Sequence, residues 1–212
     1  MKNGLRLRSA TGSQGMGEKR IGEIYESFLA IASTLSPKLR SVIAQNGPLS
    51  LEPKQDVPFA QQLCRTVVGQ QLSLKAAASI WQRLVTSVPV GNELIDYLDG
   101  ADPLALRSCG LSGAKVKTVG AITRAAKAGQ LESAELGRLN HTERTERLTT
   151  LWGIGQWTAD MMGIFYFGDV DIWPDGDVTA RKTLEKLTSK RRKTVCTAAR
   201  FSPYRSYLAL HM

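Results

Sequence analysis

The stretch LWGIGQWTAD, residues 151–160, carries two glycines two positions apart in a run that otherwise looks helical. A glycine inside a helix costs about 1 kcal/mol relative to alanine, so two of them indicate a backbone shape that only glycine adopts, or a close approach by another molecule. We predict a tight turn between two helices, in which Gly153 and Gly155 can take positive φ while Leu151 and Ile154 anchor the turn in the core. The first amides of the second helix would then be open to an anion such as a nucleic-acid phosphate. The alternative is an ordinary corner between two helices.

Composition indicates a globular chain. Of the 212 residues, 42% are hydrophobic and 22% are charged, as is usual for globular proteins. No apolar run approaches the roughly 18 residues that a membrane span needs. Residues 1–20 lack the apolar core of a secretory signal, and we expect a flexible basic arm there rather than an organelle transit peptide.

The cysteines indicate the cellular compartment, and the charge distribution indicates the class of binding partner. Cys64, Cys109 and Cys196 have neither metal-binding nor redox spacing, which predicts free thiols in a reducing compartment, either the cytoplasm (the bacterial nucleoid) or the nucleus. The net charge is +9, with five Lys and Arg against one Glu in residues 1–20, and nine against one in residues 178–212. Basic flanks on a neutral body favour a nucleic acid as the binding partner. The alternatives are an anionic membrane surface, or charge that serves only to keep the protein soluble.

Helical signals run through almost the whole chain. Residues 36–47, SPKLRSVIAQNG, open on a Ser-Pro start and close on Asn-Gly, which are typical helix boundaries. In the next segment we expect Asp56 as the cap and Pro58 in the first turn. Only residues 169–173, DVDIW, look extended, so we predict an all-α fold of roughly ten short helices. The other helical stretches are residues 21–34, 56–71, 73–88, 92–100, 102–110, 113–129, 141–155, 156–168, 178–187 and 202–212.

Several blocks of the sequence match one family. The hairpin LWGIGQWTAD and the loop DVDIWPDGDVTARK that follows it resemble the helix-hairpin-helix DNA glycosylases, which share this hairpin and a downstream Gly/Pro-rich loop ending in aspartate. Three further blocks resemble the 3-methyladenine DNA glycosylase II branch, and the matches cover most of residues 58–210. These blocks are FAQQLCRTVVGQQLSLKAAASIWQRL, LRSCGLSGAKVKTV and FSPYRSYLAL. The resemblance implies two lobes with a DNA-binding cleft between them: a central lobe at about residues 60–175, and a terminal lobe of residues 21–59 plus 176–212.

The turn WPDGDV, residues 173–178, offers two carboxylates, those of Asp175 and Asp177. The resemblance implies that Asp177 is catalytic, because a fixed carboxylate beneath C1′ stabilises the oxocarbenium-like sugar that forms as a base leaves. Asp177 also suits a plain helix N-cap, and the two roles are compatible. Asp175 and Asp171 are secondary candidates.

Tryptophan stands at position 157, where the bifunctional relatives carry the lysine that forms a Schiff base. Without an amine at this position we predict no lyase chemistry, and we interpret Trp157 as a wall of the base pocket, whose indole face suits a cationic N-alkylated purine. A core tryptophan is the alternative. Further pocket candidates are Trp152, Tyr166, Trp173 and Trp81, although a place in the core is favoured over the pocket for each of these four. The cluster cysteines that some relatives carry near the C-terminus are missing, so we expect no iron–sulfur cluster. No cofactor is expected to be required, although a monovalent cation could bridge the hairpin to a DNA phosphate.

The resemblance also implies a set of DNA contacts. The loop VGQQLS would enter the minor groove, with Gln70 or Gln71 as the plug that fills the gap left by a flipped base. Two polar residues at a helix end are the alternative. For each cation, an ordinary solvated charge is the alternative to phosphate neutralisation. The expected contacts are Gly153, Ile154, Gly155, Gln156 and Thr158 of the hairpin, Gln70 and Gln71, and the cations Lys75, Lys115, Lys117, Arg181 and Lys182.

The expected function is monofunctional excision of alkylated purines from double-stranded DNA by a monomeric protein with no membrane contact. One rival is a hairpin-bearing DNA-binding module without catalysis. The carboxylate of Asp177 argues against it, since pure binding needs no anion facing a polyanion. A second rival is a glycosylase for oxidised or mismatched bases, and Trp157 in place of lysine argues against its bifunctional forms.

Overall fold

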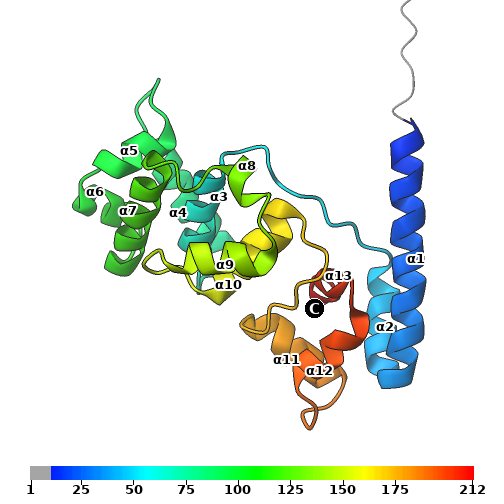
Figure 1. The fold of residues 1–212 in the computed structure, drawn as a ribbon. Coiled ribbons are helices and arrows are strands. Elements are labelled where there is room, and N and C mark those ends of the chain that lie inside the picture. Colours follow the sequence, from blue (N-terminus) through cyan, green and yellow to red (C-terminus); the bar gives the residue numbers. More distant parts are fainter. Residues whose placement is uncertain (1–10) are drawn as a thin grey trace, which may run out of the picture.

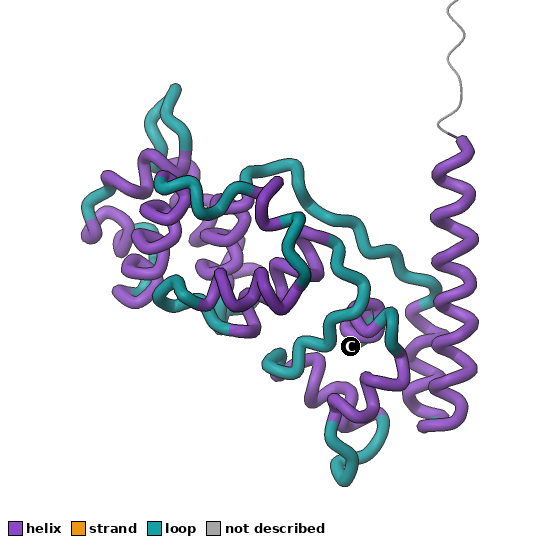
Figure 2. The backbone as a smooth tube through the Cα atoms, viewed as in Figure 1, coloured by secondary structure: helices purple, strands orange, loops and turns teal. Residues whose placement is uncertain are grey.

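The computed structural model describes residues 11–212, and every regular element among them is a helix (Figures 1 and 2). The predicted all-α fold is confirmed, with thirteen α-helices in the described part of the chain. Residues 169–173, which looked extended in the sequence, form no strand and belong to the loop between two helices.

The buried apolar side chains form two separate clusters. The first core is built by the middle of the chain, from Phe59 to Tyr166, and in Figure 1 its helices lie together on the left. Its helices are α3 (Phe59–Gly69), α4 (Leu74–Thr86), α5 (Leu94–Gly100), α6 (Pro103–Ser108), α7 (Gly113–Lys127), α8 (Ser133–Leu136), α9 (His141–Thr149), α10 (Gln156–Met162) and the π-helical turn η1 (Gly163–Phe167).

The second core joins the two ends of the described chain. Phe28 packs edge-on against Phe201 with 4.8 Å between the ring centroids. The hydroxyl of Ser36 donates to the carbonyl oxygen of Leu187 at 2.6 Å, so the start of the second helix is tied to the end of a helix 151 residues away. The helices are α1 (Thr11–Leu35), α2 (Pro37–Asn46), α11 (Val178–Leu187), α12 (Thr194–Ala198), the 3₁₀ turn η2 (Ala199–Phe201) and α13 (Arg205–Leu210).

Short polar caps explain where several helices begin. Ser36 caps α2 with Pro37 in its first turn, and Gly47 ends that helix at φ 68°, as the sequence predicted. Ser73 accepts from the amide of Ala76 at the start of α4. Such caps satisfy amides that have no partner within the helix.

Two local predictions were wrong. Pro58, not Asp56, occupies the N-cap of α3, and no side chain caps that helix. α1 begins at Thr11, so residues 11–20 of the expected flexible arm are helical, while residues 1–10 lie outside the described residues. Among the described residues, no helix combines the length and apolarity needed to cross a membrane.

Candidate active site

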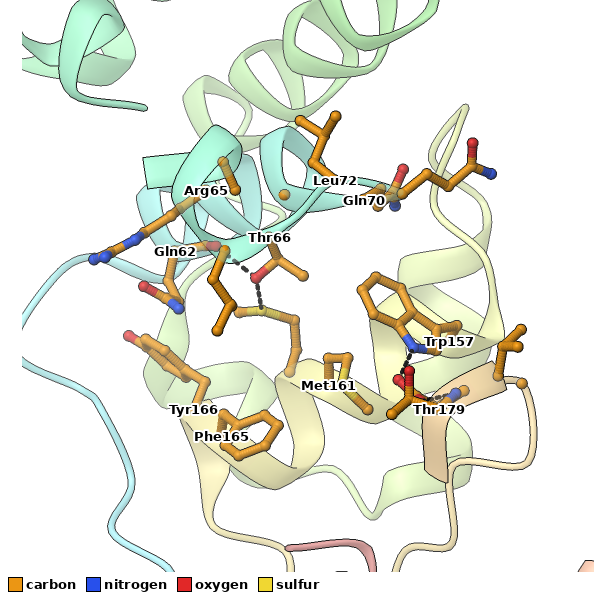
Figure 3. A pocket seen from close by; sticks show the side chains of 18 of the residues that line it. Gln62, Arg65, Thr66, Gln70, Leu72, Trp157, Met161, Phe165, Tyr166 and Thr179 are labelled. Atoms are coloured by element: carbon orange, nitrogen blue, oxygen red, sulfur yellow. Dashed lines mark hydrogen bonds between the residues drawn. The ribbon is translucent and has the colours of Figure 1, made fainter. Parts of the chain in front are cut away.

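A cavity of about 810 Å³ opens where α3, α10, η1 and the start of α11 come together. Figure 3 shows side chains from these elements converging on it. The walls are largely apolar, with a few polar groups, which is the usual character of a small-molecule site. They include Gln62, Thr66, Trp157, Met161, Phe165, Tyr166 and Asp177.

Asp177 combines the two roles that the sequence allowed. It is the N-cap of α11, and its Oδ1 accepts hydrogen bonds from the amides of Thr179 and Ala180, both at 2.9 Å. The backbone enters through a turn in which the amide of Asp177 donates to the carbonyl oxygen of Pro174 at 2.8 Å. The half-buried carboxylate nevertheless lines the cavity, so the cap also holds a negative charge at its wall.

Trp157, in the first turn of α10, lies beside this carboxylate. Its indole Nε1 donates to Oδ2 of Asp177 at 2.9 Å, and its ring lines the cavity (Figure 3). The sequence pointed to the ring but not to this hydrogen bond, because the two residues come from different helices 20 positions apart.

The opposite wall comes from the end of the same helical segment. The π-helical turn η1 continues α10 and presents Phe165 and Tyr166 to the cavity. The hydroxyl of Tyr166 donates to the carbonyl oxygen of Val57 at 3.2 Å. Burial raises the pKa of this phenol, so it stays a neutral hydrogen-bond donor.

The other tryptophans that were candidates for the pocket lie elsewhere. Trp152 is exposed on the hairpin turn, with the ammonium of Lys117 4.2 Å from its ring centroid. Trp173 is buried in the second core, and its Nε1 donates to Oδ1 of Asp175 at 3.1 Å. Trp81 packs, partly buried, against the first core. None of the three lines the cavity.

The carboxylates of Asp175 and Asp171, the secondary candidates, bind side chains from later parts of the chain. Asp175 also accepts from the hydroxyl of Thr194 at 2.6 Å, which fixes the loop to the start of α12. Asp171 accepts from the guanidinium of Arg205 at 2.7 Å. Neither lines the cavity beside Asp177.

The two glycines of the hairpin differ in what requires them. Gly153 has φ 82°, and an added Cβ there would overlap the side chain of Thr118, so packing and conformation both exclude a larger residue. Gly155 is the N-cap of α10 at φ −115°, which any residue adopts, and an added Cβ would meet nothing within 4 Å. The expected positive φ is therefore present at Gly153 but not at Gly155.

Of the remaining hairpin residues, some are accessible and some are not. Ile154 and Thr158 are buried, so their side chains do not reach the surface. Gln156 is exposed and donates to Oδ1 of Asp160 at 2.8 Å. His141, which no sequence signal selected, holds the same oxygen through Nε2 at 2.9 Å. This network ties α9 to α10 behind the turn.

The two glutamines of the α3–α4 corner are not equivalent. Gln70 is half-buried, and its Nε2 donates to the hydroxyl of Thr158 at 2.9 Å. Gln71 is exposed. Its φ is 57°, and it is the one residue other than glycine with a positive φ among residues 11–212. A left-handed conformation costs a non-glycine residue about 1–2 kcal/mol.

The cations expected to bind phosphate also differ from one another in their exposure and in their contacts. Lys115 is turned inward, donating to the carbonyl oxygens of Val68 at 2.8 Å and Gln70 at 2.9 Å, and burial lowers its pKa. It supports the α3–α4 corner, and the residue is half-buried. Lys75 and Lys182 are exposed and Arg181 is half-buried, and within residues 11–212 none of these three has an ion pair.

Comparison with known proteins finds relatives of this chain in sequence. No protein-family model matches the chain. A relative named DNA-3-methyladenine glycosylase 1, from Schizosaccharomyces pombe, is 34% identical over 138 residues, which are 62% of this chain and 58% of the relative. The matched part thus spans less than two thirds of that relative's length. The alkylbase DNA glycosidase-like protein mag2 of the same yeast is 28% identical over 73% of this chain and 74% of its own length.

Solved structures agree with the sequence relatives. The structure of the Schizosaccharomyces pombe 3-methyladenine DNA glycosylase in complex with abasic DNA has a TM-score of 0.76 at 24% identity, covering 89% of this chain and 94% of that one. A DNA-3-methyladenine glycosidase from Bacillus halodurans has a TM-score of 0.67 at 28% identity, covering 83% and 87%. The fold is that of the helix-hairpin-helix DNA glycosylases. The sequence relatives point the same way, since the chain is similar in sequence to proteins named as 3-methyladenine or alkylbase DNA glycosylases.

Proposed function

We propose that the protein is a monofunctional DNA glycosylase of base-excision repair, which hydrolyses the N-glycosidic bond of alkylated purines such as 3-methyladenine and 7-methylguanine. The observation that carries the proposal is the carboxylate of Asp177, fixed by two amides and an indole N–H at the wall of a cavity next to the hairpin. A purely DNA-binding module has no use for a fixed anion at such a place.

The cavity suits a base taken out of the duplex. At about 810 Å³ it lies within the size range of small-molecule sites, and a base can reach such a site only after it is flipped from the stack. The face of Trp157 offers the cation–π partner that a positively charged purine prefers. The aromatic residues Phe165 and Tyr166 would enclose the base from the other side.

Asp177 would act on the sugar. As the glycosidic bond breaks, the bonding electrons leave with the purine and positive charge develops at C1′, where a fixed carboxylate stabilises it. Water then adds to C1′ and releases a proton. A purine that carries a positive charge leaves as a neutral molecule and needs no protonation, whereas a neutral purine needs an acid. The ionisable groups of the cavity wall are Lys54, Arg65, Tyr166 and Asp177, and histidine and glutamate are not among the lining residues.

The DNA backbone would be held at the hairpin. The exposed amides beside Gly155 suit a phosphate, directly or through a monovalent cation, and this contact positions the duplex without reading sequence. Gln71, which is exposed, is a better candidate than Gln70, whose amide is bonded to Thr158, for the plug that replaces the flipped base. Lys75 and Arg181 would neutralise neighbouring phosphates. We further propose that the protein acts as a monomer without a required cofactor, in the nucleoid or the nucleus.

Release of bases from methylated DNA tests the proposal. Duplex DNA treated with a methylating agent would be incubated with the protein, and the free bases separated by chromatography. We expect 3-methyladenine and 7-methylguanine in solution and intact strands before alkali treatment. Binding without release would favour the non-catalytic module, and strand breaks at neutral pH would contradict the absence of lyase chemistry.

A further inference from the structure

The carboxylate of Asp177 is held from two directions. The amides of Thr179 and Ala180 in α11 both bind Oδ1, while the indole N–H of Trp157 in α10 binds Oδ2. The two bonds from α11 restrain Oδ1 but leave Oδ2 without a donor in that helix, so coupled small rotations about the Cα–Cβ and Cβ–Cγ bonds can still shift Oδ2. The bond from α10 removes that freedom.

We propose that Trp157 is a positioning residue, whose N–H fixes the direction in which Asp177 presents its negative charge to the sugar. This inference rests on the proposed function of the site. It gives the indole two separable roles: its face forms a wall of the cavity, and its edge orients the carboxylate (Figure 3). The face acts on binding of the base, and the edge acts on the rate of bond breaking.

Charge stabilisation depends steeply on placement. A fixed anion stabilises a developing cation because it needs no reorganisation as the reaction proceeds, and small displacements of a reacting group can cost about 10²-fold in rate. Loss of the N–H would also leave Oδ2 more negative, which by itself would favour the cation. We expect orientation to dominate, because the Oδ1 bonds keep the charge near the site but do not aim it.

A second hydrogen bond from an indole N–H to an aspartate carboxylate occurs in the chain, away from the cavity. The indole of Trp173 donates to Asp175, which lies two residues before Asp177. That pair anchors a loop in the second core, with Thr194 as a further donor. It provides a matched control, since replacing Trp173 removes an equivalent indole donor from a carboxylate that does not line the cavity.

Two replacements of Trp157 separate its roles. Trp157→Phe keeps a six-membered ring and removes the N–H. Trp157→His removes the larger part of the ring face, but its Nε2 stands where the indole nitrogen stands within a five-membered ring, so at pH 8 the neutral imidazole can still donate. Base release from a duplex with one 7-methylguanine would be measured in single turnover as a function of protein concentration. The fits give a maximal rate constant and a half-saturation concentration.

We expect Trp157→Phe to lower the maximal rate about tenfold or more with little change in half-saturation, because a hydrogen bond to a charged group is lost. Trp157→His should keep the rate within about threefold and raise half-saturation about tenfold, because stacking area is lost. Trp173→Phe should leave both parameters unchanged, and thermal melting would verify that all three variants are folded.

A maximal rate of the Phe variant equal to that of the unaltered protein would overturn the positioning role while leaving the proposed function intact. Equal losses of rate in the Phe and His variants would also overturn it, because they would indicate a general packing role. Absence of release by the unaltered protein would overturn the proposed function and, with it, this inference.

Discussion

The turn at residues 150–155 and the turn at residues 173–177 each carry a pair of like residues, and in both turns the two members serve different ends. In the first turn, Gly153 is required by its positive φ and by Thr118, whereas nothing among residues 11–212 requires Gly155 to be glycine. In the second, Asp175 ties the loop to α12, whereas Asp177 lines the cavity.

The glutamines of the α3–α4 corner repeat this division, since Gln70 is bonded to Thr158 and Gln71 is exposed in a left-handed conformation. In the glycine and aspartate pairs, one residue serves contacts inside the protein, and the other lies on open surface or at the cavity. Both glutamines line the cavity, but only Gln70 is bonded to Thr158. Residue type alone is therefore a poor guide to a site. The identity of Gly155 and the strain at Gln71 are left unexplained by the fold, and an outside partner can account for them. Asp177 is also explained by its N-cap bonds, and its place at the cavity wall is what distinguishes it from Asp175.

The largest expected effect separates the two aspartates. Asp177→Asn should lower the single-turnover rate of base release by about 10²-fold or more, because an aimed charge in the site is lost, while DNA binding stays intact or tightens. Asp175→Asn should leave the rate within a few-fold. Rates within a few-fold of the unaltered protein for Asp177→Asn would remove the distinction between the two carboxylates.

Replacing Gly155 should weaken DNA binding, whereas replacing Gly153 should lower the stability of the protein. Gly155→Val should bind damaged and undamaged duplexes about tenfold more weakly, since a phosphate contact carries no information on the base, and should unfold at the same temperature. Gly153→Ala should lower the free energy of unfolding by about 1–3 kcal/mol, because of its backbone strain and its overlap with Thr118. Fluorescence anisotropy and denaturant titration measure the two quantities. A loss of affinity confined to damaged DNA would contradict the phosphate role of Gly155.

The glutamines should show the smallest effects. Gln71→Gly relieves a left-handed residue and should raise the free energy of unfolding by up to about 1 kcal/mol, yet slow base release severalfold because the plug is lost. Gln70→Ala should lower the free energy of unfolding by about 1 kcal/mol, since the bond to Thr158 is lost. If Gln71→Gly released bases at the normal rate, the plug would have to be sought elsewhere on the corner.

The sequence predicted the helices whose limits have a local cause. α2 lies between Ser36 and Gly47, and α11 covers residues 178–187 as expected, because caps and turn residues act within a few positions. α8 and α12 were not predicted, since they have only four and five residues and too few apolar positions to show a period. α3 begins without the expected cap because Pro58 takes the N-cap position itself.

The candidate site was predictable only in part. Family resemblance selected Asp177 and Trp157, but the bond between them depends on how α10 meets α11, which no local pattern encodes. The same reason explains why Lys115 was expected at DNA, whereas it binds carbonyl oxygens at the end of α3. Trp152 and Trp173 show the limit of residue type, because four tryptophans look alike in sequence and only Trp157 lines the cavity.

The central claim is that the cavity excises purines that already carry a positive charge, with Asp177 as the group that stabilises the sugar. Single-turnover release of 7-methylguanine and of hypoxanthine from one duplex context tests it most directly. The account predicts clearly faster release of 7-methylguanine, because this cationic base needs no proton and the lining residues include no histidine or glutamate to supply one. Equal rates, or faster release of hypoxanthine, would contradict the account and indicate a general acid at the site.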